Sequence, residues 1–250
     1  MAYKYLIDKA LKLRQDTFNA FIEHGEAHLG GSFSIIEILL ALHEEVLMKE
    51  DKFILSKAHA SFPYCIYLRE KGFNLPVSTH LEIDLENNIH CTTGSLGHGL
   101  PISVGMALAR KFENRKGKIY VMISDGECQE GTTWESLLIA ARHKLDNLVL
   151  FVDYNKIQAL STLKEALPLD NLASKFKAFN WDTVEVANGH SFDEIIHALK
   201  RPIISSKPRV IIFHTIKGKG VKAFEGDPAW HARKIKGAEM EIGKKELGLL

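Results

Sequence analysis

The sequence predicts an α/β protein with an open, mostly parallel β-sheet flanked by helices. Two observations indicate this class. Several short segments are β-branched and apolar without alternation, which is typical of strands buried on both faces of a parallel sheet. Amphipathic segments of helical period lie between them. With 250 residues, 46% of them hydrophobic, the chain can bury a substantial core, and neither a repeat nor a linker divides it. We expect a single domain spanning residues 1–250.

The first half of the chain predicts helices followed by a loop. Apolar residues recur at helical spacing near the amino terminus, and region 73–90 has no sustained period. Glycines then punctuate T-T-G-S-L-G-H-G, and the segment behind that loop starts with Pro101 and ends at Gly117, which brackets a helix. The expected helices are 3–24, 34–48, about 61–71 and 101–117.

The second half begins with a strand–helix–strand unit, because two apolar segments are joined by one amphipathic segment. Further strands and helices alternate after it, and Ser191 is a suitable N-cap for one of the helices. The expected strands are 118–124, 147–153, 181–187 and 207–216. The expected helices are about 132–145, 169–178, 191–201 and 238–246, the last after a loop-rich tail that starts at Lys217.

Composition and charge exclude several classes of protein. Thirty-two basic and thirty-one acidic residues leave a formal charge of +1, so no bulk field attracts nucleic acid or a membrane surface. The amino terminus lacks the apolar core of a signal peptide, and no segment has the roughly 20 apolar residues that cross a bilayer. The cysteines Cys65, Cys91 and Cys128 have no zinc or disulfide spacing. We therefore expect a cytoplasmic protein with small-molecule substrates.

Two polar side chains follow neighbouring predicted strands at the point where each strand ends. Asp125 follows strand 118–124, and Asn155 stands just past strand 147–153. Ligands of open parallel sheets bind beyond the carboxyl ends of the strands, so both side chains are expected in one crevice. Their oxygens suit Mg²⁺ or Ca²⁺ better than zinc. Since Mg²⁺ usually keeps ligand positions for phosphate oxygens, a diphosphate is the implied guest.

The glycine-rich loop at 92–99 supports a phosphate-binding function. Gly94, Gly97 and Gly99 let the backbone pass close to a ligand, and a helix amino terminus lies directly behind them. Such loops are common before helices, and an Asp–Gly pair is equally typical of a turn with an N-cap. The loop and the two polar residues together predict the site.

Two motifs carry a resemblance to a known family. S-D-G-E-C-Q-E-G at 124–131, followed by V-D-Y-N-K-I-Q, resembles the thiamine-diphosphate motif of transketolases. Further similar motifs follow the family's order, over about residues 5–232. They are A-H-L-G-G-S near residue 30, F-I-L-S-K-A-H-A at 53–60, T-T-G-S-L-G-H-G at 92–99, T-I-K-G-K-G-V at 215–221 and P-A-W-H at 228–231. The chain is identified as a member of the thiamine-diphosphate-dependent enzymes, which implies their cofactor-binding fold.

The resemblance implies how the cofactor is held. Asp125 and Asn155 would bind Mg²⁺, with Ca²⁺ as the other option, together with the backbone carbonyl of Ile157. Gly126 would let the diphosphate come close. Gly94 and Leu96 would offer backbone contacts to the aminopyrimidine side of thiamine diphosphate.

It also implies roles for charged and titratable residues. Glu130 would join a glutamate network that links two active sites across a dimer. Four histidines would line the substrate channel or touch the diphosphate, binding sugar hydroxyls and carrying protons; they are His28, His59, His80 and His231. Lys217 would lie near the same diphosphate.

The sequence departs from the family pattern in four places. Ser124 replaces the glycine that usually opens the diphosphate motif, and Ala58 stands in S-K-A-H where the family has glycine. His90 replaces a glutamate before T-T-G, and A-R-K-I-K follows His231. The last two changes lie on the substrate side, so they bear on the identity of the acceptor sugar more than on cofactor binding.

The resemblance finally implies a partner. In the family a glutamate from a second, pyrimidine-binding domain activates the cofactor, and this sequence stops at Leu250 before such a domain. We therefore expect the N-terminal subunit of a split transketolase, in an α₂β₂ assembly with a C-terminal subunit that supplies the activating glutamate. The pair would transfer a two-carbon ketol unit from a ketose to an aldose or related sugar. Two alternatives remain open: the α subunit of a 2-oxo acid dehydrogenase, and a non-catalytic accessory subunit.

Overall fold

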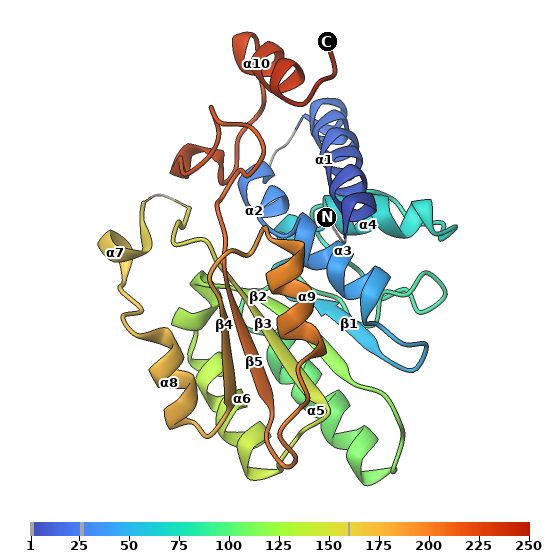
Figure 1. Ribbon diagram of the computed structural model, residues 1–250, viewed down its shortest axis with the longest axis vertical. Helices are drawn as coiled ribbons and strands as arrows, with labels where there is room; N and C mark the ends of the chain where they lie inside the picture. Colours follow the sequence, from blue (N-terminus) through green and yellow to red (C-terminus); the bar gives the residue numbers. More distant parts are fainter. Residues whose placement is uncertain (1–2, 26–27, 160) are drawn as a thin grey trace.

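The fold is built on one parallel sheet (Figure 1). The computed structural model describes residues 3–25, 28–159 and 161–250. Within these ranges the sheet has five strands in the order β1-β2-β3-β5-β4, and every neighbouring pair is parallel. The strands are β1 (Lys52–Leu55), β2 (Ile119–Ser124), β3 (Leu148–Tyr154), β4 (Asp182–Val186) and β5 (Arg209–His214). This confirms the predicted fold class and four predicted strands.

Helices cover both faces of the sheet. The α-helices are α1 (Lys4–His24), α2 (Leu29–Phe33), α3 (Ile36–Glu45), α4 (Phe62–Glu70), α5 (Gly99–Phe112), α6 (Gly131–Arg142), α7 (Leu163–Ala166), α8 (Leu172–Ala178), α9 (Phe192–Lys200) and α10 (Ala238–Glu246). Short 3₁₀ helices are η1 (Ala58–Ala60), η2 (Gly126–Gln129) and η3 (Pro228–Trp230). Each predicted helix is present, with shifted ends in several cases.

Alternation along the strands divides the core into two layers. Phe151 of β3 packs in the cluster formed with α1, α3, α4 and α9, and its neighbour Leu150 packs in the cluster with α5, α6 and α8. Successive strand side chains point to opposite faces, so a strand buried on both faces must be apolar throughout. All six residues of β2 are buried, as the unalternating sequence predicted.

Besides the short 3₁₀ helices, one strand and two short α-helices were not predicted, and α5 was predicted to end too far along the chain. The segment 52–55 forms edge strand β1, and α2 and α7 are single turns inside segments without a helical period of their own. Helix α5 begins at Gly99, two residues before Pro101, because proline is tolerated in the first turn. It ends at Phe112 rather than Gly117, since Asn114 takes a left-handed backbone with φ of 50°.

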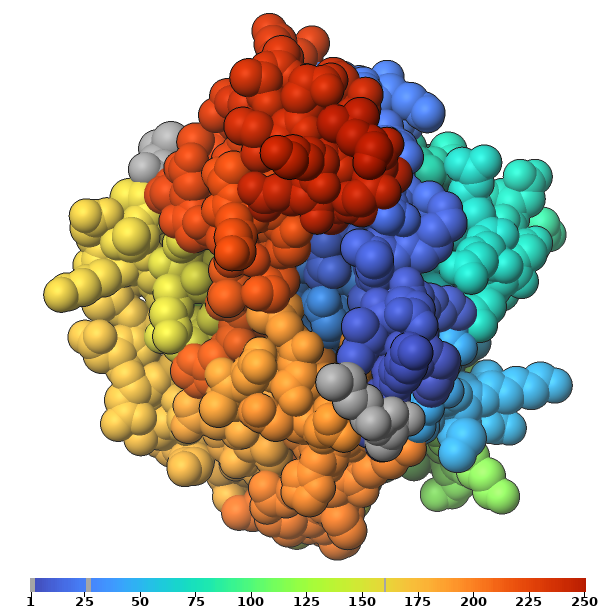
Figure 2. Space-filling view, turned by 45° about the horizontal axis from the view of Figure 1, so that its top comes forward, coloured from blue at the N-terminus to red at the C-terminus, as the bar shows by residue number. Residues whose placement is uncertain are grey.

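The two ends of the described chain pack together. The C-terminal segment, red in Figure 2, lies beside the blue N-terminal helix. A Cβ added at Gly243 of α10 would lie 2.3 Å from Phe18 of α1, and Gln15 donates to the Leu247 carbonyl at 2.7 Å. Across the three described ranges, no helix has both the length and the apolar character needed to cross a membrane.

Parallel pairing places the ends of neighbouring strands at one edge. Ser124, the last residue of β2, pairs in register with Asp153 of β3, and the Asp125 amide donates to the Asp153 carbonyl at 3.2 Å. The loops that follow β1, β2, β3 and β5 therefore meet at the carboxyl edge of the sheet, where the polar motifs of the sequence lie.

Candidate cofactor site

A cavity of about 230 Å³ opens at this carboxyl edge. Its walls come from the loops after four strands. The lining includes Lys57, His59, Leu96, Asp125, Gly126, Glu130, Asn155, Ile157, Lys217 and His231. Most of the residues proposed from the sequence thus lie around one cavity, although they are spread over some 175 positions of the chain, from 57 to 231.

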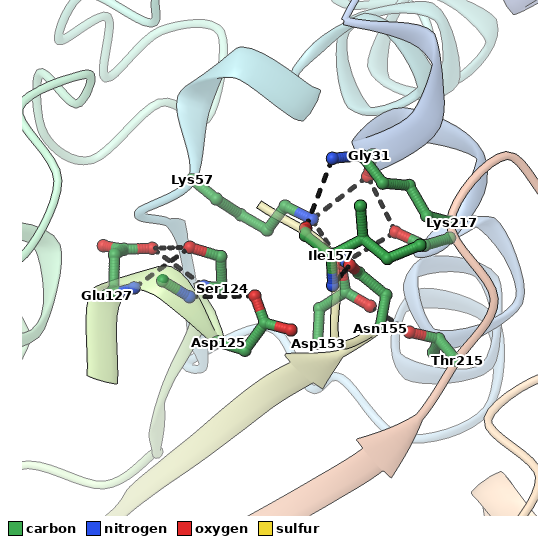
Figure 3. A network of polar contacts seen from close by, with 12 residues as sticks. Gly31, Lys57, Ser124, Asp125, Glu127, Asp153, Asn155, Ile157, Thr215 and Lys217 are labelled. Atoms are coloured by element: carbon green, nitrogen blue, oxygen red, sulfur yellow. Dashed lines mark hydrogen bonds and ion pairs between the residues drawn. The ribbon is translucent and has the colours of Figure 1, made fainter. Parts of the chain in front are cut away.

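Asp125 and Asn155 both face this cavity. The two carboxylate oxygens of Asp125 accept backbone hydrogen bonds from Gly126 at 2.8 Å and from Lys156 at 2.6 Å. The Asn155 side-chain oxygen accepts from the Ile157 amide at 3.1 Å. Short loops after adjacent strands therefore bring the predicted carboxylate, amide and carbonyl groups together, as Figure 3 shows.

The Asp125 carboxylate is costly to ionise in its position. Burial, and then the negative charge of Asp153, raise the pKa of Asp125 to about 7, and the backbone hydrogen bonds and Lys57 only partly offset this. A divalent cation here would satisfy the carboxylate, and the surrounding donors are hard oxygens of the kind that Mg²⁺ prefers. The residues therefore fit the predicted metal. In the described part of the chain, no group of three or more His, Cys, Asp or Glu residues could hold an ion by itself.

A buried ion pair that was not predicted from the sequence lies beneath the cavity. Lys57 Nζ lies 2.5 Å from Asp153 Oδ2, and both side chains are 1% exposed or less. Asp153 also accepts from Asn155 Nδ2 at 3.0 Å, which fixes the amide so that its oxygen is the atom left for a ligand. The hydroxyls of Ser34 and Thr215 donate to the same carboxylate. Asp153 thus orients Asn155 from behind.

The signal for this pair was present in the motifs. Lys57 belongs to F-I-L-S-K-A-H-A, and Asp153 is a charged residue at the end of an apolar strand. Burial alone would raise the pKa of Asp153, but the neighbouring Lys57 ammonium and the hydrogen bonds outweigh it, and the pKa lies below its ordinary value.

A further residue that was not predicted, Glu127, fastens the glycine-rich loop to the diphosphate motif. Its carboxylate accepts from the Gly97 amide at 3.0 Å, from the Ser124 amide at 2.8 Å and from the Ser56 hydroxyl. The Ser124 hydroxyl also lies 3.3 Å from this carboxylate. Burial raises the pKa of Glu127. Ser124 replaces the family's glycine without strain, because it is an ordinary strand residue.

The glycine-rich loop approaches its neighbours as closely as its glycines allow. Gly97 has a φ of 82°, and a Cβ there would lie 2.8 Å from the Glu130 side chain. A Cβ at Gly99 would lie 2.4 Å from Ser56. Leu96, directly before Gly97, lines the cavity, and α5 begins at Gly99, so a helix amino terminus follows the loop as predicted.

Three of the four predicted channel histidines form one cluster. Ring centroids of His28, His59 and His231 are 5.5–5.7 Å apart in each pair. Burial, followed by the charge of Lys57, holds the pKa of His59 well below its ordinary value, and burial with Lys217 lowers that of His231 to about 4. These two imidazoles are neutral at neutral pH.

The fourth histidine, His80, is exposed and lies apart from this cluster. A Cβ added at Gly94 would be 2.5 Å from Cδ2 of His80, so the ring lies directly against the glycine-rich loop. Neither His80 nor Gly94 is among the residues that line the 230 Å³ cavity.

Lys217 reaches the same cavity from the loop after β5. Its Nζ donates to the carbonyls of Ile157 at 3.2 Å and Gln158 at 3.0 Å, and it lies 3.1 Å from His231 Nδ1. Burial, followed by the charge of Lys57, lowers the pKa of Lys217 to about 8. The Ile157 carbonyl oxygen therefore already accepts a hydrogen bond from a cationic group.

Fold and cavity together define a class of protein: an α/β domain that offers oxygen ligands, ammonium groups and imidazoles to a phosphorylated ligand at the carboxyl edge of its sheet. Residues 23–250 match the family model "Transketolase, thiamine diphosphate binding domain". The chain belongs to this transketolase family, which confirms the resemblance predicted from the motifs.

Individual relatives agree with this assignment. The chain is 36% identical to one of the subunits of the apulose-4-phosphate transketolase of Actinobacillus succinogenes, over 99% of this chain and 97% of the relative. It is 36% identical to a 6-deoxy-6-sulfo-D-fructose transketolase subunit of Clostridium sp., over 89% of each chain. The likeness to separate transketolase subunits thus extends over nearly the whole sequence, as predicted for a subunit of a split transketolase.

A solved structure shows the same fold. The transketolase of Campylobacter jejuni superposes with a TM-score of 0.84 at 26% identity, covering 98% of this chain. The chain spans only 43% of that protein, and it spans 40% of human transketolase, to which it is 30% identical.

Proposed function

We propose that this chain, as one domain from residue 1 to 250, is the N-terminal subunit of a two-chain transketolase. With Mg²⁺ and thiamine diphosphate, the complex transfers a two-carbon ketol unit from a ketose to an aldose or related sugar. The supporting observation is the meeting of the Asp125 carboxylate, the Asn155 amide oxygen and the Ile157 carbonyl at the carboxyl edge of the sheet, next to Lys217.

The residues of this chain divide into two functions. Asp125, Asn155 and the Ile157 carbonyl hold Mg²⁺, and Lys217 provides positive charge for the diphosphate. When bound, thiamine diphosphate supplies the electron sink for carbon–carbon bond cleavage and formation. Gly126 leaves room for the phosphates, and Gly94 with Leu96 contacts the aminopyrimidine side.

The histidine cluster contributes hydrogen bonding and proton transfer. His28, His59 and His231 bind sugar hydroxyls or phosphate oxygens, and His80 contributes from the glycine-rich loop. Because His59 and His231 have lowered pKa values, each neutral ring has one nitrogen that accepts a proton and one that donates. If these histidines were protonated, beside Lys57 and Lys217, they could only donate hydrogen bonds and could accept no proton.

The partner completes the site. A C-terminal subunit with the pyrimidine-binding domain supplies the activating glutamate, in an α₂β₂ complex located in the cytoplasm, with neither nucleic acid nor membrane as a partner. Glu130 lies at the amino end of α6 beside the cavity, where it is available for the glutamate network. The names of the two relatives describe anionic sugars, so we propose phosphorylated or otherwise anionic sugars as substrates.

The test uses the chain co-expressed with the product of the adjacent reading frame. The purified pair should transfer ketol units from ketose phosphates to aldehyde acceptors only when thiamine diphosphate and Mg²⁺ are present, and this chain alone should be inactive. Asp125→Ala should abolish cofactor binding, whereas Asp8→Ala, at an exposed position of α1, should not. Decarboxylation of pyruvate onto lipoate by the pair would favour the dehydrogenase alternative. Absence of co-purification and of cofactor binding would favour an accessory subunit.

A further inference from the structure

A buried chain of polar contacts lies behind the segment that carries Lys217. Arg14 of α1 donates to Glu37 of α3 at 2.7 Å, and Nδ1 of His190, in the turn before α9, lies 3.0 Å from the other oxygen of Glu37. The Ile216 amide then donates to Nε2 of His190 at 2.9 Å. The Arg14, Glu37 and His190 side chains are all 7–9% exposed.

These contacts fix the orientation of the His190 ring. A backbone amide can only donate, so Nε2 must be the bare nitrogen of the ring and Nδ1 must carry the hydrogen. That hydrogen points to Glu37. Burial alone would raise the pKa of Glu37, but Arg14 and His190 lower it to about 2, so the acceptor is a carboxylate. His190 is therefore held in one orientation, with Nδ1 facing Glu37 and Nε2 facing the Ile216 amide.

The histidine acts on the residue next to Lys217. On one side of that lysine, Thr215 donates its hydroxyl to Asp153; on the other, the Gly218 amide donates to the Gly30 carbonyl at 3.0 Å. The Ile216 amide is the anchor between these two. Residues 215–220, here called the Lys217 loop, are thus fixed from three directions.

Arg14 also limits how far the Lys217 loop can move. Gly220 has a φ of 101°, and a Cβ at this position would lie 2.5 Å from Arg14 Cδ. The same arginine therefore neutralises Glu37 and supports the far end of the loop. A substitution of His190 would remove the hydrogen bond from the Ile216 amide, and with it the link between the Arg14–Glu37 pair and the Lys217 loop.

We propose that His190 is a positioning residue for the cofactor site: held by Glu37, it fixes the Ile216 amide and so aims the Lys217 ammonium at the cavity. The identity of the ligand rests on the function proposed above. His190 does not line the cavity and touches no reacting group; it acts through Lys217.

A double-mutant cycle in the co-purified complex tests this dependence. The dissociation constant for thiamine diphosphate, with Mg²⁺ present, is measured by equilibrium dialysis for the parent, His190→Phe, Lys217→Met and the double variant. Each single change should weaken binding about tenfold, as expected for a lost hydrogen bond or charge contact. The double variant should bind no more weakly than Lys217→Met, because neighbours that act as one unit are not additive.

Two results of the cycle would overturn the proposal. Multiplying effects, about a hundredfold in the double variant, would mean that His190 acts independently of Lys217. If Lys217→Met binds thiamine diphosphate as tightly as the parent, the Lys217 ammonium does not contribute to binding and its positioning by His190 has no effect on the site. His190→Gln, whose amide has one donor and one acceptor, should restore most of the affinity. If His190→Phe does not fold by circular dichroism, His190→Asn, which is too short for both contacts, takes its place.

Hydrogen exchange provides a readout that needs no cofactor. In the ligand-free complex, amides of 215–220 should exchange faster in His190→Phe than in the parent. The matched control is His197→Gln, an exposed histidine on α9, which should leave them unchanged. Unchanged exchange in His190→Phe would contradict the proposal. If the parent complex binds no thiamine diphosphate, the proposed function fails, yet this exchange result still decides whether His190 fixes the loop.

Discussion

Two buried ion pairs stand at opposite edges of the same sheet. At the amino edge, Arg209 of β5 pairs with Asp182 of β4 at 2.6 Å, and the two residues are in register. At the carboxyl edge, Lys57 pairs with Asp153 of β3 at 2.5 Å. All four side chains are at most 4% exposed, so burial alone does not distinguish a structural pair from one that serves a site.

The two pairs differ in what surrounds them. Nη1 and Nη2 of Arg209 also donate to the carbonyls of Arg201 and Pro202, so every nitrogen of the guanidinium has an acceptor within the protein. Beside Lys57 and Asp153, in contrast, lies a cavity with Asp125, whose pKa is raised, and Lys217, whose pKa is lowered. Neighbouring groups with shifted pKa values around an open cavity, rather than the ion pair itself, distinguish the edge that carries the candidate site.

Substitution of one aspartate at each edge should give the largest contrast. Asp182→Asn leaves the buried Arg209 unpaired, and we expect it to lower the free energy of unfolding by about 3–5 kcal/mol. Asp125→Asn removes a carboxylate that is costly to ionise, so stability should change by no more than about 1 kcal/mol. Affinity for thiamine diphosphate with Mg²⁺ should nevertheless fall by about a hundredfold or more. Urea unfolding and equilibrium dialysis measure the two effects, and equal stability losses would contradict the comparison.

Removal of the cation from each pair tests the same contrast from the other side. Lys57→Met and Arg209→Met should each destabilise the protein by about 3 kcal/mol, since each strands a buried carboxylate. Only Lys57→Met should also weaken cofactor binding, by about tenfold, because Asp153 holds the amide of Asn155. A cofactor defect in folded Arg209→Met would show that the amino edge is coupled to the site.

His43, which lies outside both edges, should make the stability of the fold depend on pH without any role in the candidate site. His43 packs against Phe53, Tyr64 and Tyr67, and burial lowers its pKa to about 4 from 6.5. Between these values the unfolded chain binds more protons, so stability rises with pH and is lost as pH falls from about 6.5 to 4. The loss should be about 3 kcal/mol. Thermal unfolding across this range should show a shallower dependence for His43→Leu than for the exposed control His197→Leu.

The smallest effect is expected from one hydroxyl at the carboxyl edge. Thr215→Val keeps the shape of the side chain but removes the donor to Asp153, which should cost about 1 kcal/mol in unfolding free energy. Because Lys57 and Ser34 still hold Oδ2, the oxygen of Asp153 that also positions Asn155, cofactor affinity should change by less than about threefold. A loss larger than the tenfold expected for His190→Phe would show that the Lys217 loop depends on this anchor more than on His190.

The sequence was most informative for elements whose structure depends mainly on burial of their own apolar residues. Unalternating apolar segments could only be buried parallel strands, so β2, β3 and β5 were predicted within two residues or so at each end. Strand β1 was missed because four residues are too few for a pattern, and its place depends on pairing with β2. The end of α5 at Phe112 was missed because Asn114 can adopt the left-handed conformation that stops the helix.

The candidate site divides in the same way. Asp125, Asn155 and the glycine-rich loop were recognisable from residue types at the ends of predicted elements. Lys57, Glu127, Asp153 and His190 were not, although three of them lie within motifs, because their importance comes from partners up to 153 residues away. Of the four predicted channel histidines, three meet in one cluster and His80 lies against Gly94.

The sequence by itself determined the fold class and the family and indicated candidate oxygen ligands, because local hydrophobic pattern and motif spacing are carried by neighbouring residues. Only the tertiary structure decided which charges are neutralised, since a buried charge is governed by whatever the fold packs within a few ångströms of it. Lys57 and Asp153 neutralise each other, whereas burial and the charge of Asp153 raise the pKa of Asp125 beside them.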